Sequence, residues 1–120
     1  MWPALISFGR ALMSRKIAII QLSRLLGKEE FYRRLSLDEG LEPDELSAEQ
    51  MARLRLLVDE RLEELVRGLA AEVVASDDVT DVVSGVAYLE DRLAFFSELL
   101  SAGQREKVRD GFASFASRWR

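Results

Sequence analysis

The stretch that decides the fold is a five-residue sequence that occurs twice, as Leu46-Ser-Ala-Glu-Gln50 and as Leu100-Ser-Ala-Gly-Gln104. In each copy the serine hydroxyl can accept a hydrogen bond from the backbone N–H of the glutamine, three residues further on. The glutamine side chain can in turn accept from the backbone N–H of the serine, so each copy predicts a capping box that begins a helix. The residues of this helix-capping motif are Leu46, Ser47, Gln50, Leu100, Ser101 and Gln104.

The two copies differ in the residue that follows the glutamine. In the first copy, Leu46 and Met51 are placed as the apolar pair that fixes the entry angle of the chain into a helix. In the second copy Arg105 stands where Met51 does in the first, so no such apolar pair is expected there.

The composition predicts a single helical domain over residues 1–120. Hydrophobic residues at 48% and charged residues at 32% are typical of a globular chain, and only two prolines interrupt it. The chain has no Cys and no His, which removes disulfides, thiolate nucleophiles, Cys/His zinc sites and imidazole bases. We therefore expect no enzyme activity, no metal site and no cofactor.

The net charge of −4 is unevenly distributed along the chain. Residues 1–37 contain seven Lys or Arg and two Glu, whereas residues 38–120 contain ten Lys or Arg and nineteen Asp or Glu. The basic N-terminal segment and the acidic remainder can attract each other, within one chain or between two chains.

Apolar periodicity predicts an all-α fold of four to five helices. The helix over 48–75 has one nearly straight apolar stripe, and the helix over 78–100 has a heptad seam from Val82 to Leu100. Only the Ser76–Asp77 region separates these two helices, so we expect a long antiparallel helical hairpin. The predicted helices cover residues 3–26, 28–37, 48–75, 78–100 and 102–118.

The acidic residues between these helices are interpreted as structural. Ser76, Asp77 and Asp78 are expected to end one helix and to cap the next. Carboxylates at helical spacing can bind metals in a bundle, but such sites normally include His, which this chain lacks. Solvent-exposed helix faces are the interpretation that we favour.

Residues 3–26 are predicted to form a core helix. Arg10, Arg15 and Lys16 interrupt every apolar run, so the segment is too polar to span a membrane, and it does not fit an export signal. A helix that contacts a membrane surface is an alternative that we do not favour. The chain is acidic overall and carries no recognised nucleic-acid-binding motif, so we expect no nucleic-acid partner.

The repeated sequence resembles the Leu-Thr-x-x-Gln (LTxxQ) motif of the Spy/CpxP family of small periplasmic helical proteins, with Ser47 and Ser101 in the threonine positions. The segment Tyr88–Leu100 resembles the family's penultimate helix, and Gln104–Phe112 resembles the start of its last helix. The resemblance covers about residues 46–118. The histidines of the metal-sensing branch are absent from this chain, so that branch is set aside.

The resemblance implies a cradle-shaped antiparallel homodimer that acts in the periplasm. Its activity would be ATP-independent chaperoning or stress regulation, in which apolar segments of client or partner proteins are shielded. The absence of a recognisable export signal favours a second hypothesis, a cytoplasmic helical adaptor or inhibitor whose acidic surface binds a basic partner.

The apolar faces are more extensive than one thin hairpin can cover, and large apolar patches are rare on monomers. The first helix could cover part of these faces within the same chain and give a monomeric bundle, whereas long helices of the Spy/CpxP kind would bury them against a second copy. We therefore expect a two-fold homodimer. The residues expected at the partner or dimer interface are Phe8, Leu12, Leu93, Phe96, Phe112, Phe115 and Trp119.

Overall fold

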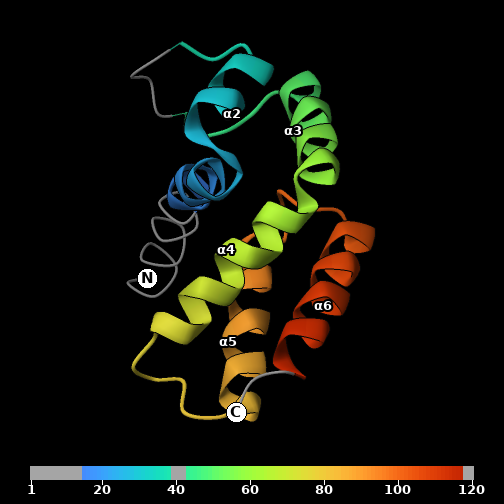
Figure 1. Cartoon of the computed structure of the whole chain (residues 1–120). Helices are drawn as coiled ribbons and strands as arrows, with labels where there is room; N and C mark the ends of the chain where they lie inside the picture. The colour runs from blue at the N-terminus through green and yellow to red at the C-terminus, as the bar shows by residue number, and fades with distance from the viewer. Residues whose placement is uncertain (1–14, 39–42, 118–120) are drawn as a thin grey trace, which may run out of the picture.

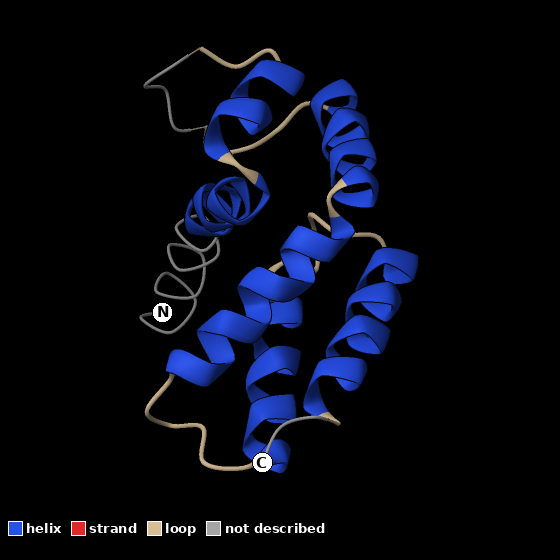
Figure 2. Ribbon diagram, in the orientation of Figure 1, coloured by secondary structure: helices blue, strands red, loops and turns tan. Residues whose placement is uncertain are grey.

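The computed structural model describes residues 15–38 and 43–117, and every regular element in this part of the chain is a helix (Figures 1 and 2). The all-α class is therefore confirmed. The described residues form six helical segments instead of four to five, because the helix expected over 48–75 is two helices. They are residues 15–26, called here the N-terminal helix, and α2 (Lys28–Arg34), α3 (Ala48–Glu60), α4 (Leu62–Ala75), α5 (Val82–Phe95) and α6 (Ala102–Ala116).

The helices form two neighbouring groups that share one core. Helices α4, α5 and α6 pack against one another in the lower part of Figure 1, while α2 packs against α3 in the upper part. The N-terminal helix buries Ala18, Ile19, Leu22 and Leu26 in the same core as the other helices. Helices α4 and α5 run antiparallel, as expected for the hairpin, but the hairpin is shorter than predicted.

The apolar stripe over 48–75 is bent at Arg61, which has φ −119° and ψ 30°. The Arg61 guanidinium donates to the carbonyl of Leu26, the last residue of the N-terminal helix, at 3.4 Å. Helix α3 then packs against α2, whereas α4 packs against α5 and α6. The bend thus lets one apolar stripe contact two different sets of helices, and no Pro or Gly marks it in the sequence.

Helix α2 ends at Arg34, three residues earlier than predicted. Ser36 takes a left-handed conformation with φ 55°. The N–H groups of Ser36 and Leu37 donate to the carbonyls of Arg33 and Tyr32, at 3.2 and 2.9 Å. This is the hydrogen-bond pattern of a Schellman stop, in which glycine usually occupies the left-handed position. With serine in that position, the sequence carried no recognisable stop signal.

Helix α5 begins at Val82, and its N-cap is Asp81. The Asp81 carboxylate accepts from the N–H of Ser84 at 2.8 Å, and the Ser84 hydroxyl accepts from the N–H of Asp81 at 3.1 Å. The hydrogen bond from the Ser84 backbone lowers the pKa of Asp81. The prediction that Asp77 and Asp78 cap this helix is therefore wrong, because a complete capping box forms three residues later.

The remaining helix boundaries agree with the predictions in part. Helix α5 ends at Phe95 instead of residue 100, and the N–H groups of Leu99 and Leu100 turn back to the carbonyl of Phe96. Helix α6 begins at Ala102 as predicted and is described to Ala116. Residues 3–14 of the first predicted helix and residue 118 of the last lie outside the described residues.

Two glycines are required by the way the helices meet. Gly27 has φ 98°, in the region that favours glycine, and it connects the N-terminal helix to α2. A Cβ atom on Gly111 would lie 3.0 Å from Cγ2 of Val66, so glycine at this position allows α6 to approach α4 closely. Both positions fix the arrangement of helices around the core.

Candidate functional site

Both predicted capping boxes are present. The Ser47 hydroxyl accepts from the N–H of Gln50 at 3.1 Å, and the Gln50 side-chain oxygen accepts from the N–H of Ser47 at 3.0 Å. The same two bonds join Ser101 and Gln104, each at 3.1 Å. The repeated sequence therefore begins α3 and α6 as predicted. Leu46 and Met51 are half-buried against the core, and Leu100 is fully buried within it.

The glutamine amides have a second role, which the sequence analysis missed. The Gln50 amide nitrogen donates to the carbonyl of Leu35 at 3.3 Å. The Gln104 amide nitrogen donates to the carbonyl of Arg55 at 2.7 Å and to a carboxylate oxygen of Asp59 at 2.9 Å. Each box thus joins its helix to another helix. The signal for this role was glutamine in place of glutamate, because only the amide can accept at the cap and also donate elsewhere.

The residues predicted for a partner or dimer interface are placed differently by the structure. Leu93, Phe96 and Phe112 are buried in the core of the chain, so the prediction of an interface role is corrected for these three. They occupy inward positions on α5 and α6 because these helices pack against α4. Phe115 is half-buried and contacts the core. Phe8, Leu12 and Trp119 lie outside the described residues.

Charges from the two parts of the sequence meet within one chain. Arg15 of the N-terminal helix pairs with Glu98 at 2.7 Å, and Lys16 pairs with Asp44 at 3.6 Å. The charge asymmetry allowed attraction either within one chain or between two chains. These ion pairs are formed within one chain. These basic side chains hold the N-terminal helix against the acidic remainder.

Three arginines connect helices by contacts with acceptor side chains. Arg34 of α2 binds Glu60 of α3 with two guanidinium nitrogens, and Arg109 of α6 binds both carboxylate oxygens of Glu90 at 2.8 and 3.0 Å. These hydrogen bonds lower the pKa values of Glu60 and Glu90. Arg92 lies 5.0 Å from the ring centre of Phe96 and pairs with Glu72 at 3.2 Å. All three contacts are structural in character.

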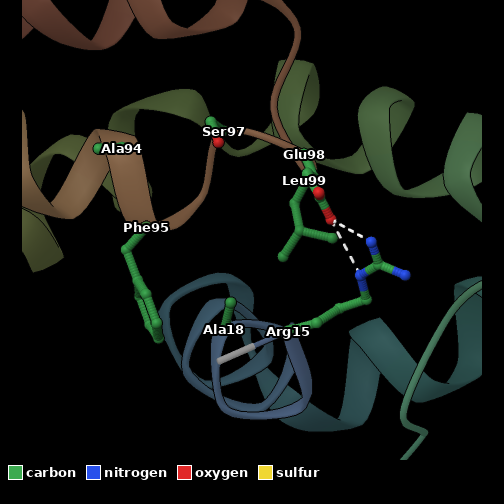
Figure 3. Close-up of a pocket in the computed structure, with 7 residues that line it drawn as sticks. All are labelled: Arg15, Ala18, Ala94, Phe95, Ser97, Glu98 and Leu99. Atoms are coloured by element: carbon green, nitrogen blue, oxygen red, sulfur yellow. Dashed lines mark hydrogen bonds and ion pairs between the residues drawn. The ribbon is translucent and has the colours of Figure 1, made fainter. Parts of the chain in front are cut away.

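A pocket of about 230 Å³ lies between the N-terminal helix and the end of α5 (Figure 3). Arg15 and Glu98 meet at its edge, where the guanidinium donates to the carboxylate at 2.9 Å. The one carboxylate in its lining, Glu98, is bonded to Arg15 and makes no described hydrogen bond with the Ser97 hydroxyl, so the lining shows no nucleophile–base pair. The lining residues are Arg15, Ala18, Ala94, Phe95, Ser97, Glu98 and Leu99.

The described part of the chain comprises residues 15–38 and 43–117. In these ranges no group of three or more carboxylates is placed to hold a metal ion. No helix in the same ranges is both long and apolar enough to cross a bilayer.

The surface feature that stands out is a group of exposed valines, Val74 at the end of α4 and Val82, Val83 and Val86 at the start of α5, called here the valine surface. Their side chains are 59, 41, 78 and 41% exposed. Only two other large apolar side chains of the described chain, Ile17 and Leu56, are exposed to this degree. The predicted heptad seam is thus buried from Leu89 onward and open to solvent at its first two positions.

An apolar groove includes one of these four valines, Val74. It lies between α4 and α6 and has a volume of about 400 Å³. Of the four valines only Val74 lines this groove, and the loop of residues 76–81 leads from Val74 to Val82 at the start of α5. The groove is lined by Arg67, Ala70, Ala71, Val74, Ala75 and Phe115.

Comparisons with known proteins give no match: no protein-family model matches the chain, and no curated protein or solved structure matches it significantly. The Spy/CpxP resemblance therefore stays a prediction. The candidate site is the valine surface with its groove, because it gathers most of the exposed large apolar side chains of the described residues.

Proposed function

We propose that this chain is a non-enzymatic helical protein-binding domain that covers an apolar segment of a client or partner protein with the valine surface. The observation that supports the proposal is the position of four of the six exposed large apolar side chains at one end of the α4–α5 pair. Contiguous exposed apolar patches mark interaction sites, whereas single exposed apolar residues need no explanation. Ile17 and Leu56 are of the second kind.

The form of binding that we propose is ATP-independent shielding, as in the Spy/CpxP family. Two observations support it: the repeated capping sequence, and an apolar groove on the outside of the α4–α5–α6 unit. The homodimer stays a prediction. Because Leu93, Phe96 and Phe112 are used inside the chain, a second copy would have to contact outer faces of the helices.

The test is suppression of the aggregation of insulin B chain, released by dithiothreitol. The reductant leaves this protein unchanged because the chain has no Cys. We expect the parent chain to slow the rise in light scattering, and the double variant Val74→Ser/Val83→Ser to require about tenfold more protein for the same effect. Partial burial of two valines is worth roughly 1–2 kcal/mol, which gives that factor.

Leu56→Ser is the matched control. Leu56 is 60% exposed on α3, outside the valine surface, so its loss should leave the suppression unchanged. Circular dichroism of each variant checks that the fold is intact. The proposal is rejected if the parent chain does not slow aggregation, or if the double variant acts as well as the parent.

A further inference from the structure

We propose that the segment bound at the valine surface is a basic amphipathic helix of a partner protein. Its apolar side chains would contact the valines and the groove, and its Lys or Arg side chains would contact Asp77 and Asp78. This inference rests on the proposed function and adds the chemistry of the partner.

The charge of the loop beside the valines is the first argument. Residues 76–81 connect α4 to α5, and therefore connect Val74 to Val82. Asp77 and Asp78 are exposed in this loop, and neither forms an ion pair with another described residue. Asp81 differs from them because its carboxylate is used in the cap of α5. Two carboxylates without a basic partner among the described residues thus border the apolar surface.

The only basic side chain that lines the groove is already paired. Arg67 donates to Glu63 on the same helix at 2.6 Å, and both side chains are exposed. Its charge is therefore balanced locally, and it does not offset the charge of Asp77 and Asp78. A partner that presents basic groups beside apolar ones complements this end of the molecule better than a neutral or acidic partner would.

The form of the groove favours a helix as the bound element. Along α4 the groove is lined by Ala70, Ala71 and Ala75, whose small side chains let another backbone approach closely. Amphipathic helices bind grooves of this kind through apolar side chains spaced three and four residues apart. The groove is part of the surface formed where α6 packs against α4.

The size of the surface favours a short segment over a second copy of this chain. A stable protein–protein interface buries about 800 Å² on each partner. The four valines and the groove together involve nine residues, whereas a standard interface uses roughly 20–30 residues on each side. A single helix matches a surface of this size, and the acidic loop supplies the polar rim at one end.

The test uses a fluorescein-labelled 18-residue peptide with leucines on one helical face and lysines on the other. Its binding to the full chain is followed by fluorescence anisotropy. We expect Asp77→Asn/Asp78→Asn to weaken binding about fivefold, because two exposed ion pairs with the peptide are lost. Raising the salt concentration should weaken binding to the parent more than binding to this variant.

Asp38→Asn/Asp91→Asn is the matched control. Asp38 and Asp91 are exposed and form no ion pair with another described residue, so this variant changes the net charge equally at positions away from the loop. It should bind the lysine peptide as the parent does. Val74→Ser/Val83→Ser should weaken binding about tenfold, because the apolar contact is lost.

Peptides with glutamine or glutamate in place of lysine separate the two proposals. Equal binding of the lysine and glutamine peptides, with no effect of the Asp77/Asp78 variant, would overturn the basic helix and leave the proposed function standing. Binding of the lysine peptide that survives the valine substitutions would reduce the contact to charge attraction and also overturn the inference. Failure of every peptide overturns it too, and the insulin assay then decides the proposed function independently.

Discussion

At the start of α3, the Gln50 amide donates one hydrogen bond of 3.3 Å to another helix, whereas at the start of α6 the Gln104 amide donates two, of 2.7 and 2.9 Å. Gln104 is only 4% exposed, while Gln50 is half-buried. The hydrogen bonds of the two boxes themselves are nearly identical in length. The similar sequences of the two motifs thus give caps of the same geometry. The two motifs differ in the acceptors that each glutamine amide contacts on another helix.

The largest effect is expected for loss of the buried amide. Gln104→Ala should lower the free energy of unfolding by about 2–3 kcal/mol, because it removes one cap hydrogen bond and two hydrogen bonds to α3, each worth about 1 kcal/mol. Gln50→Ala should cost about 1 kcal/mol, since water can reach the groups that it leaves unpaired. Urea unfolding of both variants measures the two values. Equal losses would show that the amide contacts do not distinguish the copies.

Gln104→Glu sharpens the same comparison. The carboxylate keeps an oxygen for the cap but faces the Arg55 carbonyl and the Asp59 carboxylate, so folding should raise its pKa. A raised carboxyl pKa means that the folded state binds the proton more tightly, so the deficit is present at neutral pH and shrinks as the pH falls. The Gln50→Glu variant, whose side chain is half-buried and faces one carbonyl and no carboxylate, should show less of this pH dependence.

A smaller and equal effect is expected at the two serines. Ser47→Ala and Ser101→Ala should each lower the free energy of unfolding by roughly 0.5–2 kcal/mol, the usual cost of losing a serine cap. Because the boxes have the same geometry, the difference between the serine variants should be smaller than that between the glutamine variants. Thermal melts that overlay the parent would mean that the caps do not stabilise their helices.

The smallest effect is expected from an ion pair outside the boxes. Arg109 lowers the pKa of Glu90 below the ordinary value of 4.5, so the pair stabilises the fold above that pH and loses its effect as the pH falls through the lowered value. Glu90→Gln should therefore cost at most about 1 kcal/mol at neutral pH and nothing near pH 2. Asp91→Asn, at an exposed neighbour without a described ion pair, is the control. A deficit for Glu90→Gln that persists at low pH would contradict this assignment.

The sequence was sufficient for the helical class and for both capping boxes, because those depend on residues within four positions of each other. It was insufficient for the bend at Arg61, where contacts with the N-terminal helix and two different packing partners override a continuous helical pattern. It also misplaced the start of α5, because Asp77, Asp78 and Asp81 are all good caps and only the structure shows which one has its serine partner.

The candidate site was harder to predict for a different reason. The periodicity showed that Val82 and Leu93 lie on the same apolar face, but it could not show where along the helix the packing ends. In the structure Leu93 is covered by neighbouring helices and Val82 is not, so the exposed part of the face is defined by the lengths of those neighbours. Surface exposure of this kind depends on tertiary arrangement.

The contacts of the two glutamines also differ in the length of chain that they close. The bond from Gln50 reaches back 15 residues to Leu35, whereas the bond from Gln104 reaches back 49 residues to Arg55. Closing the longer loop costs about 1 kcal/mol more in chain entropy. The α2–α3 junction can therefore form early and locally during folding, while the junction between α6 and α3 is expected to form late, once the intervening chain has collapsed.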